Sequence, residues 1–411
     1  MQIEEREIEA DQVRLGMFVC RLDRPWTETP FPLQGFQIRE LDEITQLRHY
    51  CRRVWIDVEL SAQAGRRRLL APPVTVAAAP AVVAPRREAP DPRIGATRYE
   101  DRVDFDRELP AAREALEAAV AAIGGIVDQA RAHQPILPAV AHAAARPIVD
   151  SVLRNADAVF WLNSLRRRDG YAYSHALNCA TLAAAFGRHL GLAQDMLVEL
   201  AIGAMLMDIG KTQVPDSLLH HPGPLDAMSM ARVRRHVELG TQALGDGAFG
   251  ALVREIVAGH HERMDGSGYP LRRAGLDIPL HVRVAAIVDS FDAMTSDRPH
   301  APAMARHVAL QALYRLRDTR YHAELIEQFI SCLGVYPTGS LAELNTGEIV
   351  AIMSQNVARR LRPRVLVLTD PEGAMMPSFR TLDLLETSTD IEIRRPLPDR
   401  HAGIDITELY L

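Results

Sequence analysis

The chain has 411 residues, of which 47% are hydrophobic and 24% charged, and its formal net charge is -6. A chain of this length usually forms two or three domains and can bury a core without disulfides or a structural metal. The composition excludes a collagen-like protein, a disordered acidic tail and a disulfide-rich secreted scaffold. The negative charge argues against a nucleic-acid partner, because non-specific nucleic-acid binding relies on excess positive charge.

Cysteine usage and the first residues predict a cytoplasmic protein. The four cysteines lie far apart and form no CxxC pair, so free thiols in a reducing compartment are expected. Residues 1–14 are acidic and polar, unlike a signal peptide. The longest Ala/Val-rich stretches, residues 76–85 and 117–127, are too short or too interrupted to span a bilayer. No membrane association is expected.

The first quarter of the chain divides into two parts. Residues 1–62 alternate short β-prone runs with turns and one helical stretch, which predicts a small α+β module. The strand candidates are residues 16–22, 35–38 and 53–58, and the helix candidate is residues 41–49. Residues 63–97 contain six prolines between positions 72 and 92 and show no periodicity. They are predicted to form an extended or disordered linker.

The rest of the chain is predicted to be mainly helical. Residues 98–335 show apolar side chains at helical spacing almost throughout, which favours an all-helical domain of eight or more helices. Residues 336–411 return to short strands, clearest at 347–353 and 365–369, and predict a small β-rich appendage. The expected helices span residues 108–134, 139–154, 171–190, 193–207, 226–244, 251–259, 280–296 and 302–316.

Six potential metal ligands occur in the helical region, at successive intervals of 33, 28, 24 and 28 residues. Such intervals are expected if the ligands sit on different helices of a bundle and point to one centre. Histidine and aspartate are the ligands that iron, manganese, nickel and zinc accept. The six are His175, Asp208, His236, His260, His261 and Asp289.

Local sequences strengthen this prediction. The DIGK segment that begins at Asp208 follows an apolar helix, and Gly210 is expected to end that helix and expose the Asp and Lys together. The HHERMDGSGYP segment at 260–270 places two imidazoles at a helix end, before glycines that allow close approach to a ligand. In VDSFDAMTSDRP, Asp289 and Asp292 stand three residues apart, on one helical face.

In this order, the three segments resemble the HD-GYP subgroup of the HD phosphohydrolase superfamily, over residues 170–335. Residues 1–62 are similar to the uncharacterised domain that often precedes such catalytic domains. The resemblance implies an all-helical fold with a bimetal centre. It also implies phosphodiesterase activity, the hydrolysis of the bacterial second messenger cyclic di-GMP to pGpG or GMP.

Carried over by position, the resemblance implies two metal sites that share one carboxylate. His175, Asp208 and Asp289 would hold one divalent ion. Asp208, acting as a bridge, would hold the other with His236, His260 and His261. The metals could be iron, manganese, nickel or zinc, and they would activate a hydroxide that attacks phosphorus.

Other motif positions are expected to meet the substrate or a partner. Lys211, the only lysine among 47 lysines and arginines, would place a compact cation on a phosphate oxygen. Arg298 would contribute to substrate binding. The loop Gly268-Tyr269-Pro270 would support the site or meet a signalling partner protein.

Three positions bear on how far the family pattern holds. Met207 stands where the family has a histidine before its aspartate, and a thioether is a poor ligand for iron or manganese. The site of His175 and Asp289 is therefore expected to be the weaker one, or empty. Ala301 replaces a basic residue that commonly follows the DRP motif. Tyr171 replaces a glutamate that holds a third metal in some members, so two metals are expected.

Two further interpretations stay open at this point. In the first, Met207 and Ala301 mark a catalytically degenerate domain, which binds cyclic di-GMP or a partner protein without hydrolysis. In the second, the metals form a di-iron oxygenase centre, as in some other HD folds. Lys211 and the GYP loop favour a phosphate substrate over the oxygenase.

Overall fold

A computed structural model describes residues 5–23, 29, 36–38, 41–57, 61, 94–166, 171–245, 247–298, 302–356, 359–387 and 390–408. The chain divides into two units, one of residues 1–90 with 356–361 and one of residues 91–355 with 362–411. Residues 63–93 of the predicted linker lie outside the described residues. The predicted boundaries of the four parts of the chain stay predictions.

In its described residues, the first unit contains a four-stranded antiparallel sheet in the order β1-β4-β2-β3 and the helix α1. Leu47 of the helix and Val19, Val54 and Ile56 of the strands share its core. The charged strand β1 was not predicted, and it forms by pairing along its whole length with β4. The elements are β1 Glu5–Glu9, β2 Phe18–Leu22, β3 Phe36–Gln37, α1 Leu41–Tyr50 and β4 Arg53–Asp57.

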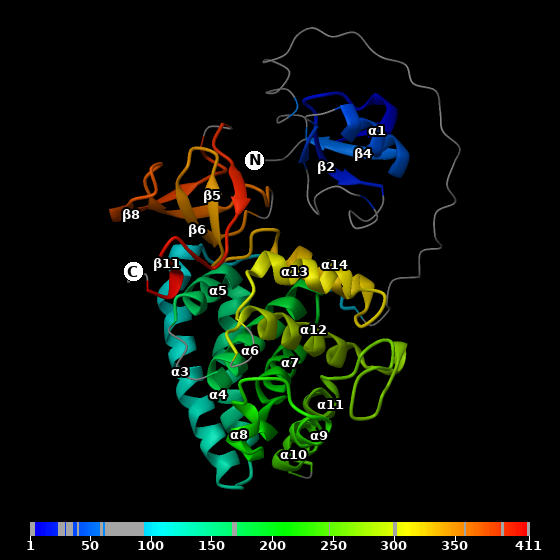
Figure 1. Cartoon of the computed structure of the whole chain (residues 1–411), viewed down its shortest axis with the longest axis vertical. Coiled ribbons are helices and arrows are strands. Elements are labelled where there is room, and N and C mark those ends of the chain that lie inside the picture. The colour runs from blue at the N-terminus through cyan, green and yellow to red at the C-terminus, as the bar shows by residue number, and fades with distance from the viewer. Residues whose placement is uncertain are drawn as a thin grey trace. The chain divides into compact units, whose positions relative to one another are not determined.

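The second unit is mainly helical, which confirms the predicted fold class (Figure 1). Most predicted helices are present, with ends that shift by a few residues. The helices are α3 Phe105–Arg131, α4 Pro138–Arg154, α5 Ala156–Ser164, α6 Tyr171–His189, α7 Gln194–Leu206, α8 Asp216–Leu219, α9 Ala227–Arg234, α10 His236–Ala243, α11 Ala251–Gly259, α12 Leu280–Thr295, α13 Arg306–Arg315 and α14 Ala323–Leu333.

Helices α5, α9, α10 and α14 differ from the sequence prediction. The predicted helix over 226–244 is two helices that meet at Arg235, so His236 begins a helix of its own. Helix α5 was missed because it follows α4 after one residue, Asn155, whose side chain caps it by accepting a hydrogen bond from the Ala158 amide. Helix α14 was missed although one face of it is apolar and buried.

Helices α7 and α12 form the buried centre of the unit. Nearly every residue of α12 from Val282 to Asp292 is buried, and so is every residue of α7 from Leu200 to Leu206. Helix α6 packs against both of them. The burial of polar Asp289 and Asp292 on α12 is unusual, since charged side chains are rarely buried without a partner.

The C-terminal residues form a five-stranded antiparallel sheet in the order β8-β7-β6-β5-β9, as the predicted β-rich appendage required. Asp157 of α5 connects the helices to this region, because it accepts hydrogen bonds from Thr338 Oγ1 and the Gln355 amide. The strands are β5 Leu341–Leu344, β6 Ile349–Ser354, β7 Arg364–Thr369, β8 Met375–Asp383 and β9 Ile393–Pro396, followed by the hairpin β10 Arg400–His401 and β11 Ile404–Asp405.

Among the described residues, no helix is both long enough and apolar enough to cross a lipid bilayer.

Candidate metal centre

The six predicted ligands come from five different places in the helical unit and lie together in space. His175 lies on α6, Asp208 follows the end of α7, and His236 begins α10. The other three lie at the end of α11 and on α12. Their nitrogen and carboxylate atoms form two groups, Asp208 with His236, His260 and His261, and Asp208 with His175 and Asp289.

Asp208 belongs to both groups because its two carboxylate oxygens face different histidines. Oδ1 lies 3.3 Å from His236 Nε2 and 3.5 Å from His260 Nε2. Oδ2 lies 3.2 Å from His175 Nε2. The carboxylate therefore stands between two sets of nitrogen atoms, as a bridging ligand would.

Asp289 completes the arrangement from the opposite side. Its Oδ1 lies 3.5 Å from His175 Nε2, and its Oδ2 lies 3.8 Å from His261 Nδ1. The His261 Nε2 atom lies 3.2 Å from His236 Nε2. The cluster is thus continuous, with His175 and His261 each reaching toward an aspartate.

The hydrogen bonds of two imidazoles indicate which of their ring nitrogens carry a hydrogen. His236 Nδ1 lies 2.8 Å from the Val233 carbonyl, and His260 Nδ1 lies 3.2 Å from the Val257 carbonyl. A carbonyl only accepts, so each Nδ1 carries the hydrogen and each neutral Nε2 presents a lone pair.

Those two lone pairs face Asp208 Oδ1, which is buried and has no hydrogen-bond partner among the described residues. Electron-pair donors that converge without hydrogens are unfavourable unless a cation lies between them. Neutral imidazoles and carboxylates are also a donor set that divalent transition metals accept. The residues therefore fit a divalent metal centre.

The electrostatics of the cluster keep its members in the forms that bind metal. Burial by itself would raise the pKa of Asp208, but the neighbouring Lys211 ammonium holds this pKa well below its usual value. Burial also opposes ionisation of Asp289, yet His175 and His261 lower its pKa. Burial and the neighbouring His260 lower the pKa of His261 well below the usual value, so it is neutral at neutral pH, as metal binding requires.

Lys211 lies within this electrostatic network. It is on the 3₁₀ turn Ile209–Gln213, and its ammonium forms an ion pair with Asp208 Oδ2. About 29% of its side chain is exposed, compared with 14% for Asp208. Lys211 therefore stands at the boundary between the buried carboxylate and solvent, where the expected substrate phosphate would approach.

A third possible metal group, formed by His175, Cys179 and Asp292, has poorer chemistry. His175 Nδ1 lies 2.7 Å from Asp292 Oδ2, which is the length of a direct hydrogen bond. Burial raises the pKa of Cys179 to about 12, and metals bind the thiolate rather than the thiol. The structure thus favours hydrogen bonding in this group and leaves His175 Nε2 for the main cluster.

The GYP loop packs against the cluster from one side. The ring of Tyr269 stacks on His261 with ring centroids 4.5 Å apart, and the Arg234 guanidinium lies 4.8 Å from the Tyr269 ring centroid. A Cβ atom at Gly268 would lie 2.5 Å from the His261 carbonyl oxygen, so only glycine fits there. Tyr269 therefore contributes to holding the His261 ring in place.

Sequence reasoning missed a residue that shapes this loop. Glu262 is 2% exposed, and its carboxylate accepts hydrogen bonds from the amides of Leu271 and Arg273. The only sequence signal is its place directly after the histidine pair. These hydrogen bonds connect Glu262, which precedes the GYP loop, to two residues that follow the loop.

The remaining predicted positions receive less support from the structure. Met207 is fully buried between the end of α7 and Asp208. Arg298 is half-buried beyond the end of α12, and its substrate contact stays a prediction. Ala301 lies outside the described residues, and only the backbone of Tyr171 is described. Gly210 does not end α7, which already ends at Leu206.

Comparison with known proteins gives two family matches. Residues 5–140 match a domain of unknown function (DUF3391), and residues 156–325 match the HD domain.

Similar curated proteins cover different shares of the chain. Cyclic di-GMP phosphodiesterase PA4108 of Pseudomonas aeruginosa is 32% identical over 388 residues, which are 92% of this chain and 89% of that protein. The cyclic di-GMP phosphodiesterase response regulator RpfG of Xanthomonas campestris pv. campestris is 33% identical over 172 residues, 41% of this chain and 45% of that protein. The 3'3'-cGAMP-specific phosphodiesterase 2 of Vibrio cholerae is 37% identical over 155 residues, 37% of this chain and 29% of that protein.

The fold and the ligand cluster define an HD-domain protein. The match along nearly the whole chain shows that it belongs to the HD-GYP family, in the form that carries the N-terminal DUF3391 domain.

Gly210 has a structural role that yields a prediction. A Cβ atom there would lie 2.0 Å from the His236 carbonyl oxygen and 2.4 Å from the Gly240 nitrogen. We expect Gly210→Ala to push α10 away, to lower the free energy of unfolding by about 1–3 kcal/mol and to weaken metal binding through His236. Denaturant unfolding and metal titration measure both effects.

Gly124→Ala is the matched control, since a Cβ there would meet nothing within 4 Å in the middle of α3. It should raise stability by about 0.5–1 kcal/mol and leave metal binding unchanged. If Gly210→Ala has the same stability and metal affinity as the wild type, the close approach of α10 to residue 210 is unimportant.

Proposed function

We propose that this protein is a metal-dependent phosphodiesterase that hydrolyses cyclic di-GMP to pGpG or GMP. The observation that carries the proposal is Asp208, whose two oxygens face two separate sets of metal-binding nitrogens. The relative that matches 92% of the chain is named a cyclic di-GMP phosphodiesterase. That name supports the choice of substrate over the related 3'3'-cGAMP, whose phosphodiesterases match a smaller share of the chain.

Two divalent ions would be held by the two groups of residues that share Asp208. His175 and Asp289 would complete one site, and the three other histidines would complete the second. When bound, a pair of such ions makes water a better nucleophile near neutral pH and stabilises the oxygen displaced from phosphorus. The chemistry of the donors suits iron, manganese, nickel or zinc.

The chain's own residues would orient and neutralise the substrate. The Lys211 ammonium forms an ion pair with Asp208. A substrate phosphate beside this ammonium would accept a charge-assisted hydrogen bond from it. Arg298 would supply a second positive charge. Tyr269 would keep the His261 ring facing the centre through the stack of their rings.

The degenerate interpretation is not favoured by the geometry. All six predicted ligands converge although position 207 is Met207, and Met207 is buried like the other residues at the end of α7. An intact cluster is more than a binding module would need. We expect Met207 to weaken the site of His175 and Asp289 without abolishing it.

Location and partners complete the proposal. The four cysteines, all among the described residues, form no disulfide, which suits a reducing, cytoplasmic compartment. The side chain of Leu271, the residue directly after the GYP loop, is 65% exposed. A signalling partner protein would contact this loop from solvent.

The proposal predicts two metals of unequal affinity and metal-dependent turnover. Metal-free protein titrated with Mn²⁺ should bind two equivalents, the weaker one at the site adjoining Met207. The loaded protein should hydrolyse cyclic di-GMP faster than 3'3'-cGAMP. Met207→His should tighten the weaker site and raise turnover, whereas Asp208→Ala should abolish both turnover and the tighter metal.

Each result has a contrary outcome. Loaded wild-type protein that binds cyclic di-GMP but releases no product would establish the degenerate interpretation. Two equal and tight sites, or unchanged metal content in Met207→His, would refute the prediction that Met207 weakens the site of His175 and Asp289. Elemental analysis and product chromatography on the same samples provide these measurements.

Lys211 gives a second prediction. Lys211→Arg keeps the charge but introduces a broader group that prefers bidentate contacts, so it should displace either Asp208 or the phosphate. Losing a charge-assisted contact costs about 1.5–3 kcal/mol, which corresponds to a loss of about 10- to 150-fold in kcat/KM. The melting temperature should change little because the positive charge beside Asp208 is kept.

Arg235→Lys is the control for this exchange, since Arg235 is exposed and pairs only weakly with Glu238. It should behave as wild type. If Lys211→Arg also matches wild type in nucleotide affinity, turnover and melting temperature, Lys211 has no specific contact with phosphate.

A further inference from the structure

The imidazole of His175 faces two ways. Its Nε2 atom faces Asp208 and Asp289 in the proposed metal centre. Its Nδ1 atom lies 2.7 Å from Asp292 Oδ2, on the side away from those ligands. Asp292 is only 3% exposed, and the function described above does not use it.

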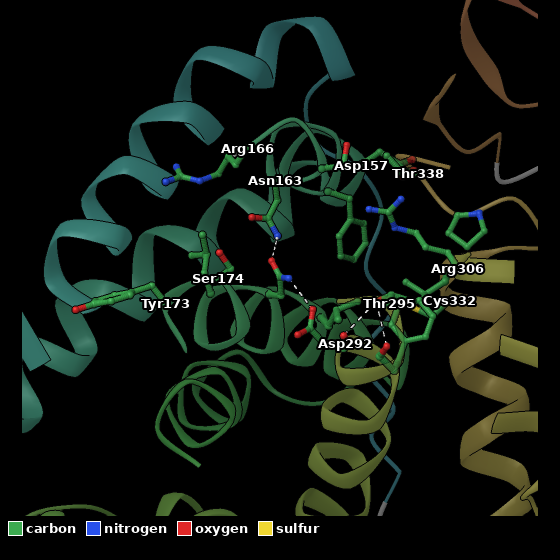
Figure 2. A pocket seen from close by; sticks show the side chains of 18 of the residues that line it. Asp157, Asn163, Arg166, Tyr173, Ser174, Asp292, Thr295, Arg306, Cys332 and Thr338 are labelled. Carbon is green, nitrogen blue, oxygen red and sulfur yellow. Dashed lines mark hydrogen bonds between the residues drawn. The ribbon is translucent and has the colours of Figure 1, made fainter. Parts of the chain in front are cut away.

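Further hydrogen bonds reach the Asp292 carboxylate from the other direction. Asn178 Nδ2 donates to Asp292 Oδ1 at 2.6 Å, and Asn163 Nδ2 donates to Asn178 Oδ1 at 2.7 Å. Figure 2 shows this chain running from Asn163 to Asp292. It crosses three helices, from α5 through α6 to α12, and every donor in it points toward the carboxylate.

This direction of donation determines which nitrogen of His175 carries a hydrogen. An ionised carboxylate can only accept hydrogen bonds, so His175 Nδ1 must donate to Asp292. The Nε2 atom of the neutral ring then presents a lone pair to the metal centre. Asp292 thereby fixes both the tautomer and the orientation of the ring.

The surroundings of the chain indicate that hydrogen bonds, rather than tight packing, hold these side chains. Asn163, Asn178 and Asp292 all border a cavity of about 140 Å³ (Figure 2). Side chains that border open space are not confined to one rotamer by their neighbours. Donation from Asn178, which Asn163 supports, and from Ser296 Oγ to Oδ2 at 3.4 Å therefore keeps Asp292 in place.

We propose that Asp292 is a positioning residue for His175, and that Asn178 and Asn163 hold Asp292 in the orientation that this role requires. The inference rests on the proposed function for the metals that His175 would bind. Hydrogen-bond partners of a metal-binding histidine commonly change metal affinity by about 10- to 100-fold when they are replaced. No contact between Asp292 and the substrate is involved.

The first test examines the metal-free wild-type protein by NMR with ¹⁵N-labelled histidine. We expect neutral His175 to carry its hydrogen on Nδ1. In Asp292→Asn, which has nearly the same size, the amide can donate to Nδ1, and the hydrogen should move to Nε2. A wild-type ring with its hydrogen on Nε2 would overturn the inference, whatever happens with metal.

The second test titrates Mn²⁺ into the same proteins. Asp292→Asn should bind the ion at the site of His175 about 10- to 100-fold more weakly, while the other site and the metal-free melting temperature stay close to wild type. Asn178→Leu should shift affinity in the same direction by a smaller factor. If both variants bind two ions as wild type does, Asp292 does not position His175.

Cys179→Ala is the matched control, because Cys179 lies 3.6 Å from His175 Nδ1 but is outside the hydrogen-bonded chain. It should keep wild-type affinity. If Cys179→Ala loses as much metal affinity as Asp292→Asn does, then His175, Cys179 and Asp292 bind metal together, and the inference is wrong. Wild-type protein that binds no metal, yet has its hydrogen on Nδ1, would refute the proposed function and retain this inference.

Discussion

The proposed metal centre depends on one carboxylate, that of Asp208, which faces nitrogen atoms on two sides. Asp208 lies two residues after the end of α7, one of the two helices at the buried centre of the unit, and its position leaves both oxygens directed at imidazoles. Burial opposes its ionisation, and the Lys211 ammonium holds its pKa well below the usual value. Converging lone pairs and a single orphaned oxygen are the physical reason to expect cations here. The other features of the site orient ligands around this point.

Two kinds of support hold those ligands. Close backbone approach fixes α10 against the turn after Asp208, where a side chain at Gly210 would collide with the His236 carbonyl. Side-chain contacts fix the rings, as Tyr269 does by stacking on His261 and Asp292 by hydrogen bonding to His175. Helix α5 extends this support, because Asn163 at one point joins the chain to Asp292, and Asp157 at another binds Thr338 and Gln355 next to the C-terminal sheet. Burial raises the pKa of Asp157 to about 6, so this link changes charge in mildly acidic solution.

The sequence predicted the ligand set more fully than the contacts that organise it. Apolar periodicity located α7, α11 and α12 because each has a buried apolar side, and the motifs then placed Asp208 just after α7, His260 at the end of α11 and Asp289 within α12. Sequence patterns did not predict the features that depend on contacts between distant parts of the chain. The break at Arg235 that starts α10 with His236 has no proline or glycine to mark it. Glycine at position 210 was interpreted as a helix end, whereas its cause is the close approach of another helix. Asp292 and Asn178 lie on predicted helices, but the hydrogen-bonded chain that holds them begins at Asn163 on α5, which no pattern predicted.

The central claim is that one carboxylate bridges two cations, and X-ray absorption spectroscopy on zinc-loaded protein tests it most directly. With two equivalents of Zn²⁺ bound, we predict a first shell of nitrogen and oxygen at about 2.0–2.2 Å. A second zinc should scatter at about 3.5–4 Å, and this signal should vanish in Asp208→Ala. A sulfur shell at about 2.3 Å, or an isolated zinc with no neighbouring metal at full loading, would contradict the account.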